Sequence, residues 1–192
     1  MQGKIFEGDY KTRCKNIDSL LCVGDTFDML KREIRLGDRH AVFYMIDGFL
    51  KGEVLEKIME FFLSLAPEDV PETYEDFLKK CTPYGDIVTV TTEQDFLHYV
   101  LSGLTGFVVE GYDEILVIDL RDYPSRSVEE PDKDKVLRGS RDGFVEAIMP
   151  NIALIRRRIR DVDLKFEIYS IGSSSRTDIS VVYMKDLSLI HI

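Results

Sequence analysis

The chain has 192 residues, of which 44% are hydrophobic and 31% charged, a composition typical of a soluble protein with one ample domain or two small ones. It contains no apolar run of about 18 residues, as a membrane span requires, and its first residues lack the apolar segment of a secretory signal. The formal net charge of −10 argues against a general nucleic-acid binder, because such proteins bind by neutralising phosphates. We therefore expect a cytosolic region.

The three cysteines, Cys14, Cys22 and Cys81, fit the same compartment. Their number is odd, and their spacing matches neither a zinc site nor a CxxC redox motif. We expect three free thiols.

The first 15 residues mix charges with glycine and show no periodicity, so we expect an irregular lead-in. Asp25 is suited to cap a helix over Thr26–Leu36, where Phe27, Leu30 and Ile34 would form one face. This helix would end at the Gly-Asp pair that follows it.

The next stretch predicts a strand and a helix. Ala41–Ile46 is a continuous apolar run of the kind found in strands buried on both faces, and Lys51–Leu65 has the apolar spacing of a helix. Residues 66–85 hold three of the six prolines and an acidic cluster. A solvated connection is the preferred interpretation of that region, with a short helix over Glu72–Lys79 as the alternative.

The middle of the chain shows clear local signals. Ile87–Thr91 predicts a strand, and Thr92 is suited to cap a helix over Glu93–Leu101. Gly106–Glu110 and Glu114–Leu120 are strand-like and flank a short loop, which predicts a hairpin.

The most distinctive stretch runs from residue 129 to residue 160, and strands are expected after it at 164–170 and 179–184. An acidic run and a loop precede apolar residues three or four positions apart, which predict one helix that ends on a cluster of arginines. The residues concerned are the acids Glu129, Glu130 and Asp132, the loop residues Arg138, Gly139 and Arg141, the apolar stripe Phe144, Ile148, Ile152, Ile155 and Ile159, and the basic residues Arg156, Arg157, Arg158 and Arg160.

The arginine cluster admits three interpretations. The cations could pair with the acidic run before the helix, meet an acidic partner or lipid headgroups, or simply favour a helix C-terminus. On a helical wheel Arg156 and Arg158 flank the apolar stripe, which favours pairing within the chain, whereas Arg157 points away from it. The loop before the helix is either an anion-binding loop or, as we prefer, an ordinary helix cap with Asp142 as the capping residue.

Residues for catalysis are few. No serine lies in a GxSxG motif, no cysteine has an evident histidine partner, and no metal-ligand spacing is present. Asp47, Asp113 and Asp119 stand at expected strand ends, where carboxylates commonly form turns. We expect no enzyme and no catalytic, metal or cofactor site.

Helices and strands alternate along the chain, so the expected fold class is α/β or α+β. The spacing of the elements suggests two small subdomains, residues 1–88 and 89–186, each a short mixed sheet packed with helices.

Residues 110–186 resemble the GerA family of spore germination proteins, whose A-type members are subunits of nutrient germinant receptors. The first ninety residues match more loosely, through Phe27-Asp28 and Tyr44–Gly48, and this half is slightly closer to the sporulation AF branch. The specific match is carried by Ile115–Asp119 with Arg121, Ser127–Pro131, Val136–Gly139, Gly143–Glu146, Asn151–Ile159, Leu164-Lys165, Gly172 and Ser175–Asp178.

The resemblance implies the cytosolic N-terminal domain of a longer protein of the spore inner membrane. Its partners would be B- and C-type receptor subunits and copies of itself, and its role would be signalling and assembly in nutrient-triggered germination. The alternatives are an AF-type accessory channel protein and a module that binds a small molecule between the two subdomains.

Two features depart from the family pattern. Pro150 stands where a helix would continue, so we expect a kink or break near Ala147. Residues 187–192 do not continue the pattern, and we interpret them as a non-native tail of a truncated chain.

Overall fold

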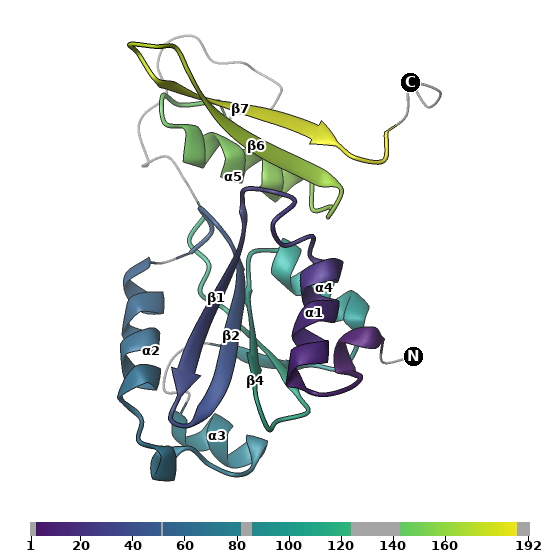
Figure 1. The fold of residues 1–192 in the computed structure, drawn as a ribbon, viewed down its shortest axis with the longest axis vertical. Coiled ribbons are helices and arrows are strands. Elements are labelled where there is room, and N and C mark those ends of the chain that lie inside the picture. Colours follow the sequence, from purple (N-terminus) through teal and green to yellow (C-terminus); the bar gives the residue numbers. More distant parts are fainter. Residues whose placement is uncertain (1–2, 51, 82–85, 124–142, 188–192) are drawn as a thin grey trace, which may run out of the picture.

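A computed structural model describes residues 3–50, 52–81, 86–123 and 143–187, which form two bodies (Figure 1). The sheet body, residues 3–123, contains a five-stranded antiparallel sheet with the order β1-β2-β4-β5-β3. Its strands are β1 (Met29–Leu36), β2 (Arg39–Ile46), β3 (Ile87–Val90), β4 (Thr105–Val109) and β5 (Ile115–Ile118). Its helices are η1 (Lys4–Phe6), α1 (Tyr10–Leu20), α2 (Gly52–Ser64), η2 (Pro67–Asp69), α3 (Tyr74–Cys81) and α4 (Glu93–Leu101).

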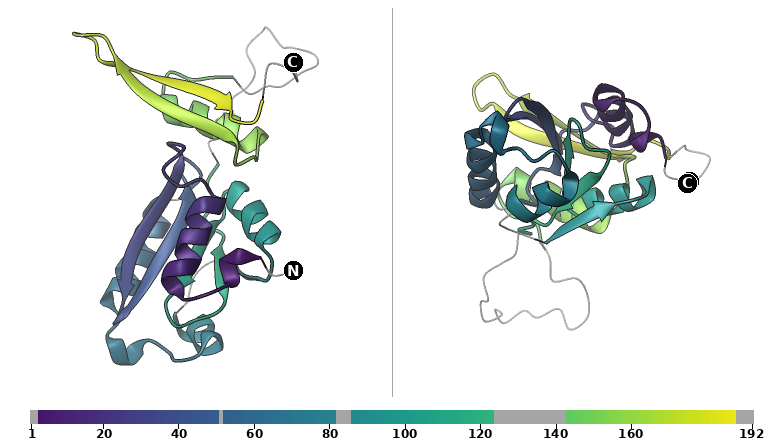
Figure 2. Two further views of the ribbon diagram at one scale, coloured as in Figure 1. Left: turned by 45° about the vertical axis from the view of Figure 1, so that its right-hand side comes forward. Right: turned by 90° about the horizontal axis from the view of Figure 1, so that it is seen from below.

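The hairpin body, residues 143–187, lies at one end of the sheet body (Figures 1 and 2). Helix α5 (Ile148–Arg158) packs on one face of an antiparallel hairpin formed by β6 (Leu164–Ile171) and β7 (Thr177–Met184). The strands expected at 164–170 and 179–184 are therefore confirmed. In the part of the chain that the structure describes, no helix is long and apolar enough to cross a membrane.

The central sheet has helices on both faces. Val42, Tyr44 and Ile46 of β2 join the core beneath α1 and α4, whereas Phe43 and Met45 join the core beneath α2 and α3. The prediction of a doubly buried strand at 41–46 is confirmed, because a central strand needs apolar side chains on both sides. The 93–101 helix is also confirmed, with the Thr92 hydroxyl accepting a hydrogen bond from the Asp95 N–H at 3.1 Å.

The helix predicted over Thr26–Leu36 is wrong, because most of this stretch is strand β1. Eight residue pairs join β1 to β2, and Gly37-Asp38 forms the two-residue turn between them, with Gly37 at φ +62°. The spacing of Phe27, Leu30 and Ile34 suggested a helix, but pairing with the buried strand decided the structure.

Two helices were missed or ranked second. The lead-in expected over the first 15 residues contains the start of α1, which Asp9 caps by accepting a hydrogen bond from the Thr12 N–H. The helix was hard to predict because its buried face includes a charged residue, Arg13, which is 3% exposed. The preferred connection at 66–85 instead includes α3, whose Phe77 is fully buried.

Helix α5 is shorter than its apolar stripe. It begins after Ala147, so Phe144 precedes it and is 70% exposed. Pro150 is the third residue of the helix, where a backbone N–H would have no partner in the helix, and this explains the break expected near Ala147. The side chain of Asn151 exchanges two hydrogen bonds with the backbone of Val145 and holds the leading segment.

The predicted division at residue 88 does not match this arrangement. Residue 88 lies within β3, and β2 pairs with β4 across that boundary, so residues on both sides belong to one sheet. The two bodies instead lie on either side of 124–142. The sheets are antiparallel throughout the described residues, where mixed sheets were expected.

Candidate functional site

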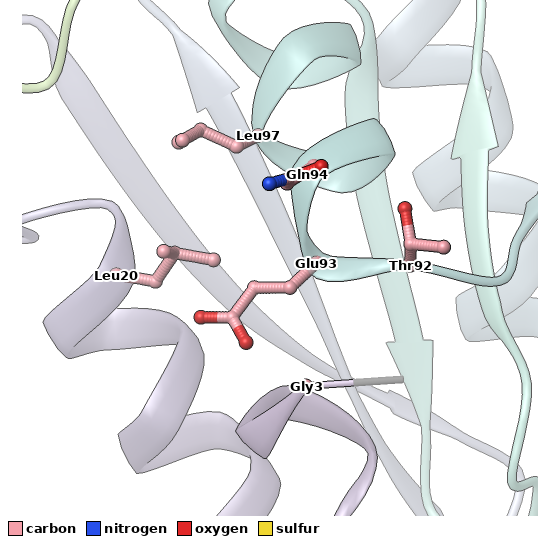
Figure 3. Close-up of a pocket in the computed structure, with 6 residues that line it drawn as sticks. All are labelled: Gly3, Leu20, Thr92, Glu93, Gln94 and Leu97. Carbon is pink, nitrogen blue, oxygen red and sulfur yellow. The ribbon is translucent and has the colours of Figure 1, made fainter. Parts of the chain in front are cut away.

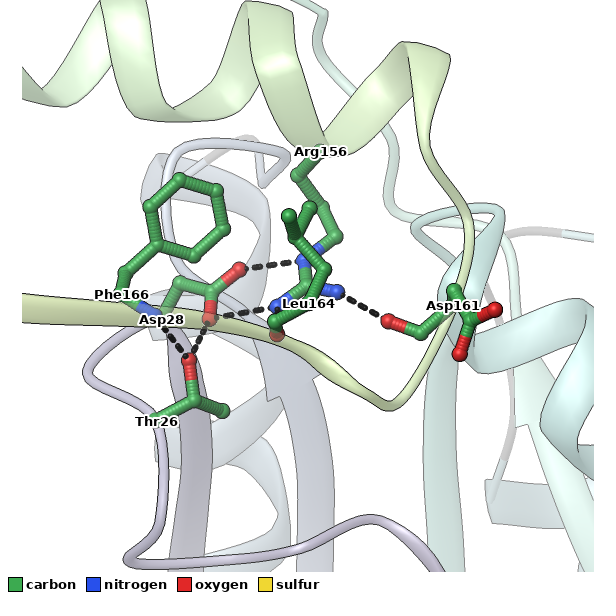
Figure 4. A network of polar contacts seen from close by, with 6 residues as sticks. All are labelled: Thr26, Asp28, Arg156, Asp161, Leu164 and Phe166. Atoms are coloured by element: carbon green, nitrogen blue, oxygen red, sulfur yellow. Dashed lines mark hydrogen bonds and ion pairs between the residues drawn. The ribbon is translucent and has the colours of Figure 1, made fainter. Parts of the chain in front are cut away.

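The contact between the two bodies is built around a buried ion pair (Figure 4). Arg156, near the end of α5, donates from Nε to Asp28 Oδ2 at 2.6 Å and from Nη2 to Asp28 Oδ1 at 3.0 Å. Asp28 precedes β1 by one residue and is fully buried, and Arg156 is 1% exposed. The guanidinium of Arg156 thus binds the carboxylate of Asp28 through two charge-assisted hydrogen bonds.

The remaining polar atoms of this pair also have partners. Arg156 Nη1 donates to the Asp161 carbonyl at 2.6 Å, and Nη2 donates a second hydrogen bond to the Leu164 carbonyl at 2.8 Å. The Thr26 hydroxyl donates to Asp28 Oδ1 at 2.7 Å, and the guanidinium carbon lies 5.1 Å from the centroid of the Phe166 ring. A buried charge pair is tolerated in a fold when its hydrogen-bonding capacity is filled in this way.

Backbone contacts accompany the ion pair and extend the hairpin toward the sheet body. The Phe27 N–H donates to the Phe166 carbonyl at 2.9 Å, and the Phe166 N–H donates to the Thr26 hydroxyl at 3.1 Å. The Asp28 carbonyl in turn accepts from the Asp47 N–H at 2.8 Å. The segment before β1 therefore lies along β6 and is fixed to the end of β2.

Gly48 allows α5 to approach the end of β2 closely. Its φ of +81° suits glycine, and a Cβ built there would lie 3.1 Å from the Cβ of Ala153 on α5. Any larger residue at position 48 would push against the helix.

Other arginines of the cluster also contact the sheet body. The guanidinium carbon of Arg157 lies 4.5 Å from the Tyr123 ring centroid, and Arg160 Nη1 donates to the Ser102 hydroxyl at 3.1 Å. Tyr123 donates to the Ser102 carbonyl at 2.5 Å, which joins these contacts. Arg157 was expected to point away from the apolar stripe and to be exposed; it is exposed, and its guanidinium also lies over the Tyr123 ring. Arg158 is exposed.

The structure places only part of the predicted site. Arg156 does pair within the chain, but with Asp28, and its burial removes it from the surface where subunit contacts were expected. The loop, its suggested cap and the acidic run lie outside the described residues. These residues are Glu129, Glu130, Asp132, Arg138, Gly139, Arg141 and Asp142.

Sequence reasoning missed Asp28 as the partner of Arg156, although one signal pointed to it. The two short motifs by which the first half resembles the family, Phe27-Asp28 and Tyr44–Gly48, both end at this contact between the bodies. Asp28, Asp47 and Gly48 all contribute to it. The loosely matching half thus meets the strongly matching half at those residues.

The three cysteines are free thiols, as predicted. Burial raises the pKa of Cys14 and of Cys81, so both are protonated at neutral pH and are poor nucleophiles. Among the described residues no group of three or more His, Cys, Asp or Glu side chains could hold a metal ion.

One pocket of about 480 Å³ lies in the sheet body between η1, α1 and α4 (Figure 3). Glu93, which lines the pocket, accepts a hydrogen bond from the Lys4 N–H at 3.0 Å, and this already uses part of its carboxylate. The pocket lies within the sheet body, but residues from both predicted subdomains, 1–88 and 89–186, line it, so it is where the small-molecule alternative would place a ligand. Its lining residues are Gly3, Leu20, Thr92, Glu93, Gln94 and Leu97.

Comparison with known proteins gives a consistent result. The family model described as Bacillus/Clostridium GerA spore germination protein matches residues 17–190. Stage V sporulation protein AF of Bacillus subtilis (strain 168) is 35% identical over 168 residues, covering 86% of this chain and 34% of that protein. Spore germination protein KA of the same strain is 27% identical over 170 residues, covering 86% and 31%. The chain thus spans about a third of the length of these relatives.

A solved structure has the same fold. The crystal structure of the N-terminal domain of the A subunit of the Bacillus megaterium spore germinant receptor GerK3 matches with a TM-score of 0.67 at 19% identity, over 94% of this chain and 66% of that chain. This likeness confirms the expected class of mixed helices and strands.

Proposed function

Because the chain belongs to the GerA family of spore germination proteins, we propose that it is the N-terminal domain of a spore germination membrane protein and acts in signalling and assembly. Its relatives match over about a third of their length, which supports a role as one domain of a larger protein. The proposed setting is the cytosolic side of the spore inner membrane, and the proposed role is non-enzymatic.

The buried ion pair is the observation that carries the signalling role. Arg156 and Asp28 join α5, which lies in the stretch that most specifically resembles the family, to the residue before β1, so the two bodies cannot move independently while this contact holds. A displacement of one body is then passed to the other. Such a contact suits a domain that reports the arrangement of neighbouring subunits.

The proposed partners are B- and C-type receptor subunits and copies of the same chain. Candidate contact residues are the exposed Arg158 and the loop that contains Arg138, Gly139 and Arg141. Cations at such positions attract acidic surfaces and set their orientation. Arg156 is left out of this set because it is buried.

The AF-type accessory role is favoured over the receptor role by one observation. Stage V sporulation protein AF is 35% identical to this chain, compared with 27% for spore germination protein KA. Deletion of the gene would separate the two: we expect a receptor A subunit to be needed for the response to particular nutrients, and an AF-type accessory protein to affect germination with every nutrient. The neighbouring genes give a second test, a receptor B and C pair or a sporulation AC–AE cluster.

Spores that lack the gene test the proposal as a whole. We expect slower or absent germination, measured as the fall in optical density after nutrient addition, and recovery when the wild-type gene is restored. A D28L/R156M double variant, which keeps an apolar contact but no charges, is expected to accumulate normally and germinate slowly. Wild-type germination of the deletion strain with every nutrient would contradict the proposed function.

The small-molecule alternative has less support, because the Lys4 N–H already occupies part of the Glu93 carboxylate in the pocket lined by both predicted subdomains. We expect no rise in melting temperature when the chain is mixed with amino acids, sugars or nucleosides. A ligand that binds only the folded state would raise it by mass action.

A further inference from the structure

The outer strands of the two sheets differ in how they are protected against pairing with another chain. In the sheet body, β1 carries four charged residues on its edge and β3 is only four residues long, and both features discourage further pairing. Strand β7 has eight residues and no proline or glycine, and its single charge, Asp178, lies near one end. The charged residues of β1 are Lys31, Arg32, Glu33 and Arg35.

The backbone of β7 directs free hydrogen-bonding groups away from β6. The Lys185 N–H donates to the Asp163 carbonyl at 2.8 Å, so residue 185 and every second residue before it bond toward β6. The alternate residues, Asp178, Ser180, Val182 and Met184, therefore direct their N–H and C=O groups outward. The described residues offer these groups no hydrogen-bond partner.

The hairpin face opposite α5 is exposed and mostly apolar, with Lys165 and Glu167 of β6 also on it. Leu164, Phe166 and Ile168 of β6 pack toward α5, so their sequence neighbours face the other way. Together the side chains of that face expose roughly 400 Å² of apolar surface, a size at which a patch on a monomer is commonly a contact surface. They are Tyr169, Ile171, Ile179, Val181 and Tyr183, each 41% to 52% exposed.

We propose that β7 pairs antiparallel with β7 of a second copy of this chain, with Val181 of the two copies opposite each other. Only this register pairs all four outward residues, with Ser180 facing Val182 and Asp178 facing Met184 of the other copy. It places the two Asp178 side chains at opposite ends, whereas a parallel pairing in register would set these like charges side by side. The inference deepens the proposed assembly role by naming a partner and a surface.

The same register extends the apolar face across both copies. Ile179 of one copy lies opposite Tyr183 of the other, and an aromatic ring beside a β-branched side chain is a favourable cross-strand pair. Pairing along the strand edges leaves most of this apolar face exposed, so the contact buries well under the roughly 800 Å² that each partner of a standard interface buries. We therefore expect weak association of the isolated chain, which strengthens where copies are concentrated.

Disulfide trapping tests the register. In a C22S background, which removes the half-exposed native thiol, V181C is expected to form at least ten times more disulfide-linked dimer than I171C under mild oxidation. Facing residues at the centre have Cβ atoms about 5 Å apart, which suits a disulfide. Position 171 is similarly exposed but pairs with Thr177, so its two copies lie roughly 26 Å apart along the strands at about 3.3 Å per residue. Equal yields from V181C and I171C would overturn the proposal.

Sedimentation of the non-oxidised chain provides the second measurement. The wild type is expected to shift toward dimer as its concentration rises, and V181K to remain monomeric because two lysines would meet at the centre. Val181 is 45% exposed, so the substitution leaves the hairpin folded. Equal association of V181K and the wild type would count against the pairing. Both measurements use the purified chain, so the pairing of β7 can be disproved while the germination phenotype is confirmed. Equally, the pairing can be confirmed while the germination phenotype is absent.

Discussion

The sheet body and the hairpin body bury their apolar side chains to different extents. In the sheet body, helices cover both faces of the sheet, and Phe62 of α2 stacks on the rings of Phe43 and Phe107 from the sheet. In the hairpin body one helix covers one face, and the fully buried apolar core contains Ile152, Leu164 and Phe166. A two-stranded hairpin of this kind is marginally stable without further packing.

This difference indicates what the residues that resemble the family contribute to the structure. The residues that resemble the family most specifically belong largely to the hairpin body, whose own core is small. Two of them, Arg156 and Ala153, contact the sheet body, at Asp28 and at Gly48. The residues that resemble the family therefore contribute to the contact between the two bodies as well as to the small core of the hairpin body.

The largest expected effect is a cavity in the sheet body. Phe62 is 1% exposed and packs against three other rings of the core, so F62A should lower the free energy of unfolding by about 4 kcal/mol. The neighbouring Leu63 is 59% exposed, and L63A should change it by less than about 0.5 kcal/mol. Urea unfolding measures both. Similar losses for the two variants would show that α2 is not packed by the face that carries Phe62.

The ion pair between the bodies should come next. R156M leaves Asp28 buried without its cation and should cost about 3 kcal/mol, whereas D28L/R156M should recover most of that loss because neither charge remains. Hydrogen exchange should show the R156M loss first in the hairpin body.

An exposed ion pair across the same contact supplies the control. Lys185 Nζ lies 3.3 Å from Asp25 Oδ2, with both side chains more than half exposed, so K185M should cost less than about 1 kcal/mol. If R156M and K185M had equal effects, burial would not be what gives the Arg156 pair its strength.

Local signals in the sequence predicted several elements but not their partners. The apolar run at 41–46 and the Thr92 cap identified β2 and α4, because each signal acts within a few residues. β1 was missed because its apolar spacing imitates a helix and only pairing with β2 reveals it. Asp28 and Arg156 are 128 residues apart, a separation that no periodicity encodes. Only the family resemblance drew attention to Asp28.

A smaller effect is expected from crowding at the contact between α5 and β2. G48A introduces a Cβ about 3.1 Å from that of Ala153 at a φ of +81°, so strain and crowding should together cost about 2 kcal/mol. Gly24 has a similar φ of +88° with nothing within 4 Å, so G24A should cost about 1 kcal/mol from strain alone. The difference in melting temperature isolates the contact with α5. Equal melting temperatures for G48A and G24A would mean that the hairpin body shifts at no cost to make room for the added Cβ.

The smallest expected effect concerns a carboxylate on the exposed hairpin face. Hydrogen bonds from the Tyr169 and Tyr183 hydroxyls lower the pKa of Glu167 below its ordinary value of 4.5. Because the folded pKa is the lower one, the stabilisation is complete above the unfolded pKa and is lost as the pH falls through the folded pKa. NMR titration of the Glu167 carboxyl should show this depressed pKa, and Y169F and Y183F should each raise it, whereas Y123F in the sheet body should leave it unchanged. Glu167 titrating at its ordinary pKa in the wild type would show that the hydroxyls do not hold the carboxylate, and that the exposed face is looser than the buried contact with Asp28.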